Sequence, residues 1–149
     1  MPLAKIIYGS LTGNTEEMAD IVCEALEKLD IEVEIDECTQ VEASEFTNAD
    51  ICIVGAYTYD EGTIPEEMLD LYEDLQELNL NGKVFGVCGS GDTFYEHYAT
   101  AVDKFEEAFL AAGAKKGTEK IKVDLAVEKE DIQQLEAFAS QLVTTYQTI

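Results

Sequence analysis

Basic residues are scarce in this chain. Lys and Arg together number 9 among 149 residues, whereas Asp and Glu number 32, so the formal net charge is -23. A negative potential of this size repels phosphate backbones and anionic membranes, and it attracts proteins with basic surfaces. We therefore expect no nucleic-acid partner and no membrane partner.

Paired cysteines are also lacking. The chain has no C-x-x-C pair, and its cysteines lie 14 or more positions apart, at Cys23, Cys38, Cys52 and Cys88. This spacing indicates neither a zinc ribbon nor a dense disulfide framework, and it favours buried free thiols. The N-terminal "MPLAK" runs into an apolar strand without the basic and hydrophobic segments of a signal peptide. We expect a reduced, cytoplasmic setting and no metal site.

No linker, repeat or low-complexity tract interrupts the sequence, and residues 1–149 are predicted to form a single domain. Short runs rich in Ile and Val predict strands at 4–8, 32–36, 50–57, 83–89 and 119–124. Apolar residues spaced by three and four predict helices over 18–29, 66–78, 94–112 and 129–146, with a weaker one over 43–47. This alternation predicts an α/β fold with a doubly wound parallel sheet, helices on both faces and ligand loops at the carboxyl ends of the strands.

Two local patterns mark helix ends. Asn14 followed by Glu17 is typical of a capping box at a helix start, and it predicts that the first helix begins directly after the first strand. The stretch "AAGAKKG" over 111–117 combines glycine with lysines, as at the end of a helix.

The first loop, "GSLTGNT" over 9–15, contains neither Lys nor Arg. Its hydroxyl groups belong to Ser10, Thr12 and Thr15. Because the loop opens a helix, the amides from Leu11 to Thr15 can converge on an anion with the positive end of the helix dipole behind them, and Gly13 permits a positive φ. An ordinary helix cap needs only one such hydroxyl, so this loop favours a phosphate.

Other phosphate-binding loops are excluded at this position. A P-loop needs G-x-x-x-x-G-K-[ST] and a dinucleotide turn needs G-x-G-x-x-G, and the stretch has neither. A response-regulator receiver domain needs acidic residues after the first strand, an Asp after the third and a Lys after the last. The corresponding residues here are Gly9-Ser10, Tyr57-Thr58 and Asp124.

Aromatic residues gather in the loops that follow the third and fourth strands. The loop "AYTYDEGTIPEE" over 56–67 contains Tyr57 and Tyr59 beside acidic residues. The loop "CGSGDTFYEHY" over 88–98 contains Asp92, Phe94, Tyr95 and Tyr98. Singly, each aromatic residue is explained as a lid over the core, but together they are candidates for stacking on a flat ring. With the first loop, they predict a phosphorylated planar ligand.

These three loops, in this order, closely resemble those of flavodoxins, and the similarity runs across essentially the whole chain. The phosphate loop of the family reads [ST]-x-T-G-x-T, and "SLTGNT" matches every defined position. The resemblance implies a five-stranded doubly wound sheet of order 2-1-3-4-5 that binds FMN at the switch point. The long insertion in the last strand is absent, as in a short-chain flavodoxin.

The resemblance also implies roles for individual residues. Tyr59 matches the aromatic residue that covers one face of the isoalloxazine ring, Tyr95 matches the one that stacks on the other face, and Asp92 matches the position at the pyrimidine edge. No catalytic residue is implied. The predicted cofactor site comprises Ser10, Leu11, Thr12, Gly13, Asn14, Thr15, Tyr57, Thr58, Tyr59, Asp60, Glu61, Ser90, Gly91, Asp92, Tyr95 and Tyr98.

Asp60 departs from the pattern of many short-chain members, which carry Gly directly after the outer aromatic residue. In those members the peptide turns over on reduction, so that its carbonyl accepts a hydrogen bond from N5. Asp tolerates a positive φ less well than Gly, so we expect weaker semiquinone stabilisation here. Spectroelectrochemical titration of Asp60→Gly tests this, and an unchanged semiquinone yield removes the idea.

The resemblance implies a low-potential one-electron carrier that binds FMN noncovalently and cycles chiefly between semiquinone and anionic hydroquinone. Carboxylates near the ring would repel the added charge, each lowering the potential by at most roughly 70 mV at about 10 Å and an effective dielectric constant of about 20. They would also steer basic redox partners, such as a flavodoxin/ferredoxin reductase or an oxidoreductase. A monomer is expected.

Two alternatives remain open from the sequence alone. A flavodoxin-like FMN-dependent quinone reductase would need a nicotinamide site and oligomer contacts, and no extra segment supplies them. A regulatory module without flavin would use the same loops to bind a partner.

Overall fold

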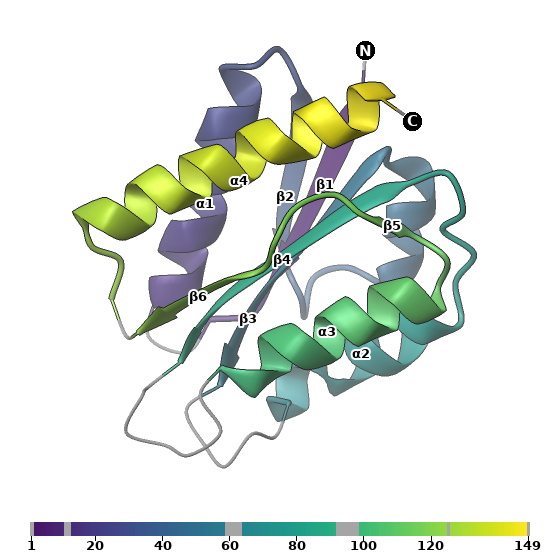
Figure 1. Ribbon diagram of the computed structural model, residues 1–149. Helices are drawn as coiled ribbons and strands as arrows, with labels where there is room; N and C mark the ends of the chain where they lie inside the picture. Colours follow the sequence, from purple (N-terminus) through teal and green to yellow (C-terminus); the bar gives the residue numbers. More distant parts are fainter. Residues whose placement is uncertain (1, 11–12, 59–63, 92–98, 125, 149) are drawn as a thin grey trace.

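A parallel sheet forms the centre of the protein (Figure 1). The computed structural model describes residues 2–10, 13–58, 64–91, 99–124 and 126–148. In these ranges the strands are β1 (Leu3–Tyr8), β2 (Glu32–Glu37), β3 (Ile51–Thr58), β4 (Val84–Gly91), β5 (Lys115–Lys116) and β6 (Ile121–Asp124). Their order is β2-β1-β3-β4-β5, β6 also pairs with β4, and every pairing is parallel. The predicted fold class and strand order are confirmed.

Helices cover both faces of the sheet, as predicted (Figure 1). One face carries α1 (Asn14–Glu27) and α4 (Lys129–Thr148), whose apolar side chains form one core with the sheet. The other face carries the 3-10 turns η1 (Ala43–Asn48) and η2 (Glu66–Met68) with α2 (Leu69–Gln76) and α3 (Thr100–Ala111), which form a second core. In the described ranges, no helix is long and apolar enough to cross a membrane.

The inner strands β3 and β4 are buried along their whole length. All residues of β3 and β4 are buried, because each strand has a neighbour on both sides and helices on both faces. Their near-continuous apolar sequences are what such a position in a parallel sheet requires. This rigid centre fixes where the loops after β3 and β4 begin.

The last strand differs from its prediction. A single strand over 119–124 was expected, but the edge beyond β4 consists of two pieces, β5 and β6. The lysines of "AAGAKKG" lie in β5 and not at a helix end, although Gly113, with φ 90°, does follow α3 as predicted. Between the pieces the chain passes close to the core at Gly117, where a Cβ would lie 2.7 Å from Leu142 Cδ2.

Two predicted helix starts also differ. α1 begins after strand β1 as expected, but its N-cap is Gly13, so Asn14 is the first helical residue and the predicted capping box was wrong. α3 begins at Thr100, after Ala99 in a left-handed conformation with φ 48°. Of the predicted segment 94–112, residues 94–98 lie outside the described ranges.

Lys5 ties the β2 edge of the sheet to η1. Its side chain is only 2% exposed, and Nζ lies 2.6 Å from Asp36 Oδ2 and 2.9 Å from Glu45 Oε1. Burial alone would lower the pKa of Lys5, but hydrogen bonds and charge interactions with both carboxylates outweigh it, so the pKa is raised. The ammonium group therefore stays charged and offsets part of the acidic repulsion at this edge.

All four cysteines are free. Cys38, Cys52 and Cys88 are buried, as predicted, whereas Cys23 is half-buried. Burial raises the pKa of Cys88 from its ordinary value of 9.0 to about 12, and burial also raises the pKa of Cys52 to about 12.

These thiols predict a loss of stability in alkali. Between pH 9 and 12 the unfolded chain releases protons that the folded chain keeps, so each buried thiol lowers the free energy of unfolding by up to about 1.4 kcal/mol per pH unit. The free energy of unfolding of Cys88→Ala, measured with urea at several pH values in this range, is expected to fall less steeply with pH than that of the wild type. The two slopes against pH are expected to differ by up to about 1.4 kcal/mol per pH unit. An unchanged slope would show that Cys88 does not carry the effect.

Candidate functional site

The first predicted loop lies at the carboxyl end of β1. The Gly9 N–H donates to the Gly55 carbonyl at 3.0 Å, which sets the loop beside β3. Ser10 Oγ accepts a hydrogen bond from the Gly13 N–H at 3.0 Å, so the loop turns back on itself before α1. Gly13 has φ 91°, and a Cβ built there would have no atom of the described residues within 4 Å. The space next to the start of α1 is therefore open.

The start of α1 offers hydrogen-bond donors to this space. The first hydrogen bond of the helix runs from the Glu17 N–H to the Gly13 carbonyl at 3.0 Å, so the amides of the first turn lie at the open N-terminal end of the helix. The 14-residue helix adds its positive dipole end. Amides, a nearby serine hydroxyl and open space fit a phosphate group without any basic side chain. Leu11 and Thr12 lie outside the described ranges.

Tyr8 binds an acidic side chain of the first turn of α1. Its hydroxyl donates to Glu16 Oε2 at 3.0 Å. Burial, followed by hydrogen bonding to Glu16, raises the pKa of Tyr8 to about 12, so the phenol stays protonated at neutral pH and keeps this bond. Glu16 is thereby bound to the residue that ends β1.

Thr15 lies in the first turn of α1, at the end of the first loop. Its side chain is buried, and Oγ1 donates to the Ala56 carbonyl at 3.3 Å and lies 2.8 Å from Ser90 Oγ. The sequence predicted that this hydroxyl would face a phosphate. In this structure its bonds run to the ends of β3 and β4, and the contact with a phosphate stays a prediction.

The second loop starts from β3, where Tyr57 and Thr58 point to different neighbours. The Tyr57 hydroxyl donates to Glu67 Oε1 at 2.8 Å, and burial together with this carboxylate raises the pKa of Tyr57. Thr58 Oγ1 accepts a hydrogen bond from the Ala101 N–H at 2.9 Å. Tyr59, Asp60 and Glu61 lie outside the described ranges.

The third loop connects β4 to α3, and its two described ends lie close together. Ser90 and Gly91 are buried, and a Cβ on Gly91 would lie 2.9 Å from the Ala99 nitrogen. Gly91 also pairs with Thr58 in the sheet. Of the residues predicted on this loop, Asp92, Tyr95 and Tyr98 lie outside the described ranges.

The described ends of all three loops therefore lie together. Gly9 bonds to β3, Thr15 bonds to β3 and contacts Ser90 of β4, and Thr58 bonds to the start of α3. This meeting point is the carboxyl edge of neighbouring strands β1, β3 and β4, where the sequence predicted the ligand (Figure 1).

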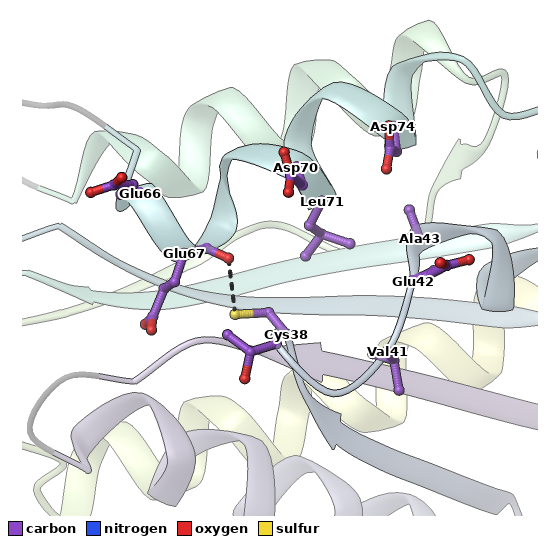
Figure 2. A pocket seen from close by; sticks show the side chains of 10 residues that line it. Cys38, Val41, Glu42, Ala43, Glu66, Glu67, Asp70, Leu71 and Asp74 are labelled. Carbon is purple, nitrogen blue, oxygen red and sulfur yellow. Dashed lines mark hydrogen bonds between the residues drawn. The ribbon is translucent and has the colours of Figure 1, made fainter.

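An acidic groove beside this edge was not predicted from the sequence (Figure 2). It has a volume of about 420 Å³ and lies between the residues after β2 and those of η2 and α2. Its acidic lining residues are Glu42, Glu66, Glu67, Asp70 and Asp74. The acids at 66, 70 and 74 are spaced by four, so the sequence did carry a sign of one acidic helix face.

Cys38 lines the acidic groove. Its Sγ lies 3.2 Å from Glu37 Oε1 and 3.6 Å from the Glu67 carbonyl, and Figure 2 shows the second contact. Glu37, Cys38 and Glu67 each offer one atom that could bind a metal ion, and these three atoms lie within 4.8 Å of one another. Burial, with help from the Glu37 carboxylate, raises the pKa of Cys38, so the thiol is protonated at neutral pH.

Comparison with known proteins identifies relatives of this chain. The flavodoxin family model matches residues 6–138. A solved flavodoxin of Streptococcus pneumoniae TIGR4 is 57% identical, with a TM-score of 0.93 over 95% of this chain and 98% of that chain. A short-chain flavodoxin associated with a non-canonical PDU bacterial microcompartment is 51% identical, with a TM-score of 0.96 over 98% of this chain and 99% of that one.

A curated relative agrees with the solved structures. Probable flavodoxin 2 of Bacillus subtilis (strain 168) is 37% identical over 142 residues, which span 93% of this chain and 94% of the relative. Among the three functions that the sequence left open, these matches support the electron carrier. The chain belongs to the flavodoxin family, in its short-chain type, and is an FMN-binding, low-potential electron-transfer protein and not an enzyme.

Proposed function

We propose that the FMN phosphate binds at the start of α1, held by backbone amides and hydroxyls. The observation that carries this proposal is the open space beside Gly13, at the N-terminus of a 14-residue helix whose dipole favours an anion. Ser10 and the amides of Asn14 and Thr15 are the described donors. Leu11 and Thr12 complete the cradle by their place in the matched motif.

The isoalloxazine ring is proposed to bind between the loops that follow β3 and β4. Supporting this, Thr58 and Gly91 are paired in the sheet, so both loops start side by side. Tyr59 and Tyr95 are the proposed walls, with Asp92 at the pyrimidine edge. The remaining proposed contacts are Tyr57, Asp60, Glu61, Ser90 and Tyr98. The flavin supplies the one-electron chemistry, and the chain supplies orientation, exclusion of water and charge.

The acidic groove is proposed to bind the basic surface of a redox partner, such as a flavodoxin/ferredoxin reductase or an oxidoreductase. Support comes from its carboxylates at Glu66, Asp70 and Asp74, which are exposed beside the start of the proposed ring site. Opposite charges across an interface raise the association rate and orient the partners.

The cytoplasm is the proposed location, and a single-domain monomer is the proposed working form. Four free thiols suit a reducing compartment. The hydrogen bonds that join the described parts of the cofactor site lie within one chain.

The purified protein tests these proposals directly. We expect a yellow holoprotein whose visible spectrum is that of bound FMN, with one FMN per chain. We expect no oxidation of NADH by a quinone unless a reductase is added. A colourless protein that fails to bind added FMN would contradict the proposed site, and quinone-dependent NADH oxidation without a partner would instead support a quinone reductase.

A further inference from the structure

The hydroxyl group of Tyr57 forms a hydrogen bond that bridges the two described ends of the second loop. Tyr57 lies in β3, one residue before the end of the strand, and its side chain is 9% exposed. Its hydroxyl donates to Oε1 of Glu67 at 2.8 Å. Glu67 is an exposed residue of η2, where the chain returns from this loop. The direction of the bond is fixed, because an ionised carboxylate has no proton to donate.

The turn η2 is itself held against the ends of two other strands. The Glu67 carbonyl accepts a hydrogen bond at 3.6 Å from the thiol of Cys38, the residue directly after β2. Met68 is fully buried, and a Cβ on Gly9, the residue directly after β1, would lie 2.6 Å from its Sδ. The backbone of η2 is therefore fixed before the Glu67 carboxylate reaches across to Tyr57.

Tyr57 carries this restraint to the edge of the sheet where the ring is proposed to bind. It pairs with Ser90 of β4 and directly precedes Thr58, whose Oγ1 accepts a hydrogen bond from the Ala101 N–H at 2.9 Å. A hydrogen bond to a charged acceptor is stronger than one between neutral groups, but an exposed carboxylate that loses it regains water. Loss of the bond should therefore affect the position of Tyr57 more than the stability of the fold.

We propose that Glu67 is a positioning residue for the ring half of the FMN site and that it acts through Tyr57. The proposal rests on the FMN site proposed above, in which Tyr57 contacts the ring. With the bond in place, the end of β3 and its tyrosine keep one arrangement. Without it, that arrangement is occupied for a smaller fraction of the time, and a flavin that needs it binds more weakly by the same fraction.

The test measures dissociation constants for riboflavin in Glu67→Ala, Glu67→Gln and Tyr57→Phe. Riboflavin is uncharged and lacks the phosphate, so it reports on the ring half without the charge that both Glu67 variants remove. Glu67→Ala is expected to weaken riboflavin binding by about fivefold, whereas Glu67→Gln is expected to stay within about twofold of the wild type, because its amide oxygen still accepts the bond. Adding Glu67→Ala to Tyr57→Phe is expected to cause no further loss, because both remove one interaction.

Two further measurements separate positioning from a general loss of structure. The visible circular dichroism of bound FMN reports the placement of the ring, and it is expected to change in Glu67→Ala and to return in Glu67→Gln. Glu73→Ala is the matched control, because it removes an exposed carboxylate from α2 at a residue that does not line the acidic groove. It is expected to leave the affinity for riboflavin and the circular dichroism unchanged.

The proposal is overturned if Glu67→Ala binds riboflavin as tightly as the wild type. It is also overturned if Glu67→Gln loses as much affinity as Glu67→Ala, or if the effects of Tyr57→Phe and Glu67→Ala multiply. Glu67 is exposed, so its two variants decide the outcome even if Tyr57→Phe fails to fold. Failure of the wild-type protein to bind FMN would instead contradict the proposed FMN site, so the two failures are distinct.

Discussion

Gly13→Ala is expected to lower the affinity for FMN by about tenfold or more while the affinity for riboflavin changes by less than about threefold. Gly13 has φ 91° at the N-cap of α1, a conformation that side chains rarely adopt. A Cβ there would meet no atom within 4 Å, so the cost comes from backbone strain and not from a clash. The strain is relieved by rotation of the loop, which moves the amides that face the phosphate. Fluorescence quenching measures both dissociation constants.

The chain offers a matched control for this variant. Gly82 has φ 85° and also has nothing within 4 Å of its would-be Cβ, but it lies in the turn before β4 at the opposite end of the sheet. Gly82→Ala is expected to lose a similar amount of folding stability, about 1–3 kcal/mol, and to keep its affinity for FMN. Equal affinities for FMN in both variants would show that Gly13 does not shape a phosphate site.

Neutralising the acidic groove is expected to slow electron transfer with a basic reductase by about tenfold at low ionic strength. The variant carries Glu66→Gln, Asp70→Asn and Asp74→Asn, which remove exposed charges from the groove lining. Steering of this kind acts over roughly one Debye length, about 8 Å at physiological salt, so the difference from wild type is expected to vanish as salt is raised. Stopped-flow measurement of the rate at which the reductase reduces each protein, at increasing ionic strength, tests this expectation.

A second triple variant controls for net charge. Glu27→Gln and Glu136→Gln lie on α1 and α4, which cover the other face of the sheet, and Glu32→Gln lies at the start of β2. It loses the same number of charges far from the groove, so we expect a much smaller change in rate. If both triple variants slow the reaction equally, net charge governs association and the groove has no special role.

Most of the fold could be predicted because apolar periodicity and strand order follow local rules. The buried runs of β3 and β4 were predicted to within about two residues, since strands covered on both faces must be apolar throughout. The split edge of β5 and β6 was missed, because it depends on how closely Gly117 approaches α4 and the core. Such tertiary contacts leave no local pattern.

The positions of the loops that carry the proposed site were predictable, but the contacts of their side chains were not. The "SLTGNT" motif correctly placed a loop at the start of α1, because the loop sequence and the helix start are adjacent in the chain. The sequence could not show that the Thr15 hydroxyl contacts Ser90, 75 positions away. The acidic groove was missed for a similar reason, since Glu42 and Asp70 come from segments that only the fold brings together.

The central claim is that this acidic protein holds a phosphate dianion with amides and hydroxyls alone. The salt dependence of FMN binding tests it most directly. The net charge of -23 repels FMN, and salt screens that repulsion, so the dissociation constant for FMN is expected to fall as ionic strength rises, while that for uncharged riboflavin stays nearly constant. A dissociation constant for FMN that rises with salt, as at a site built on Lys side chains, would contradict the account.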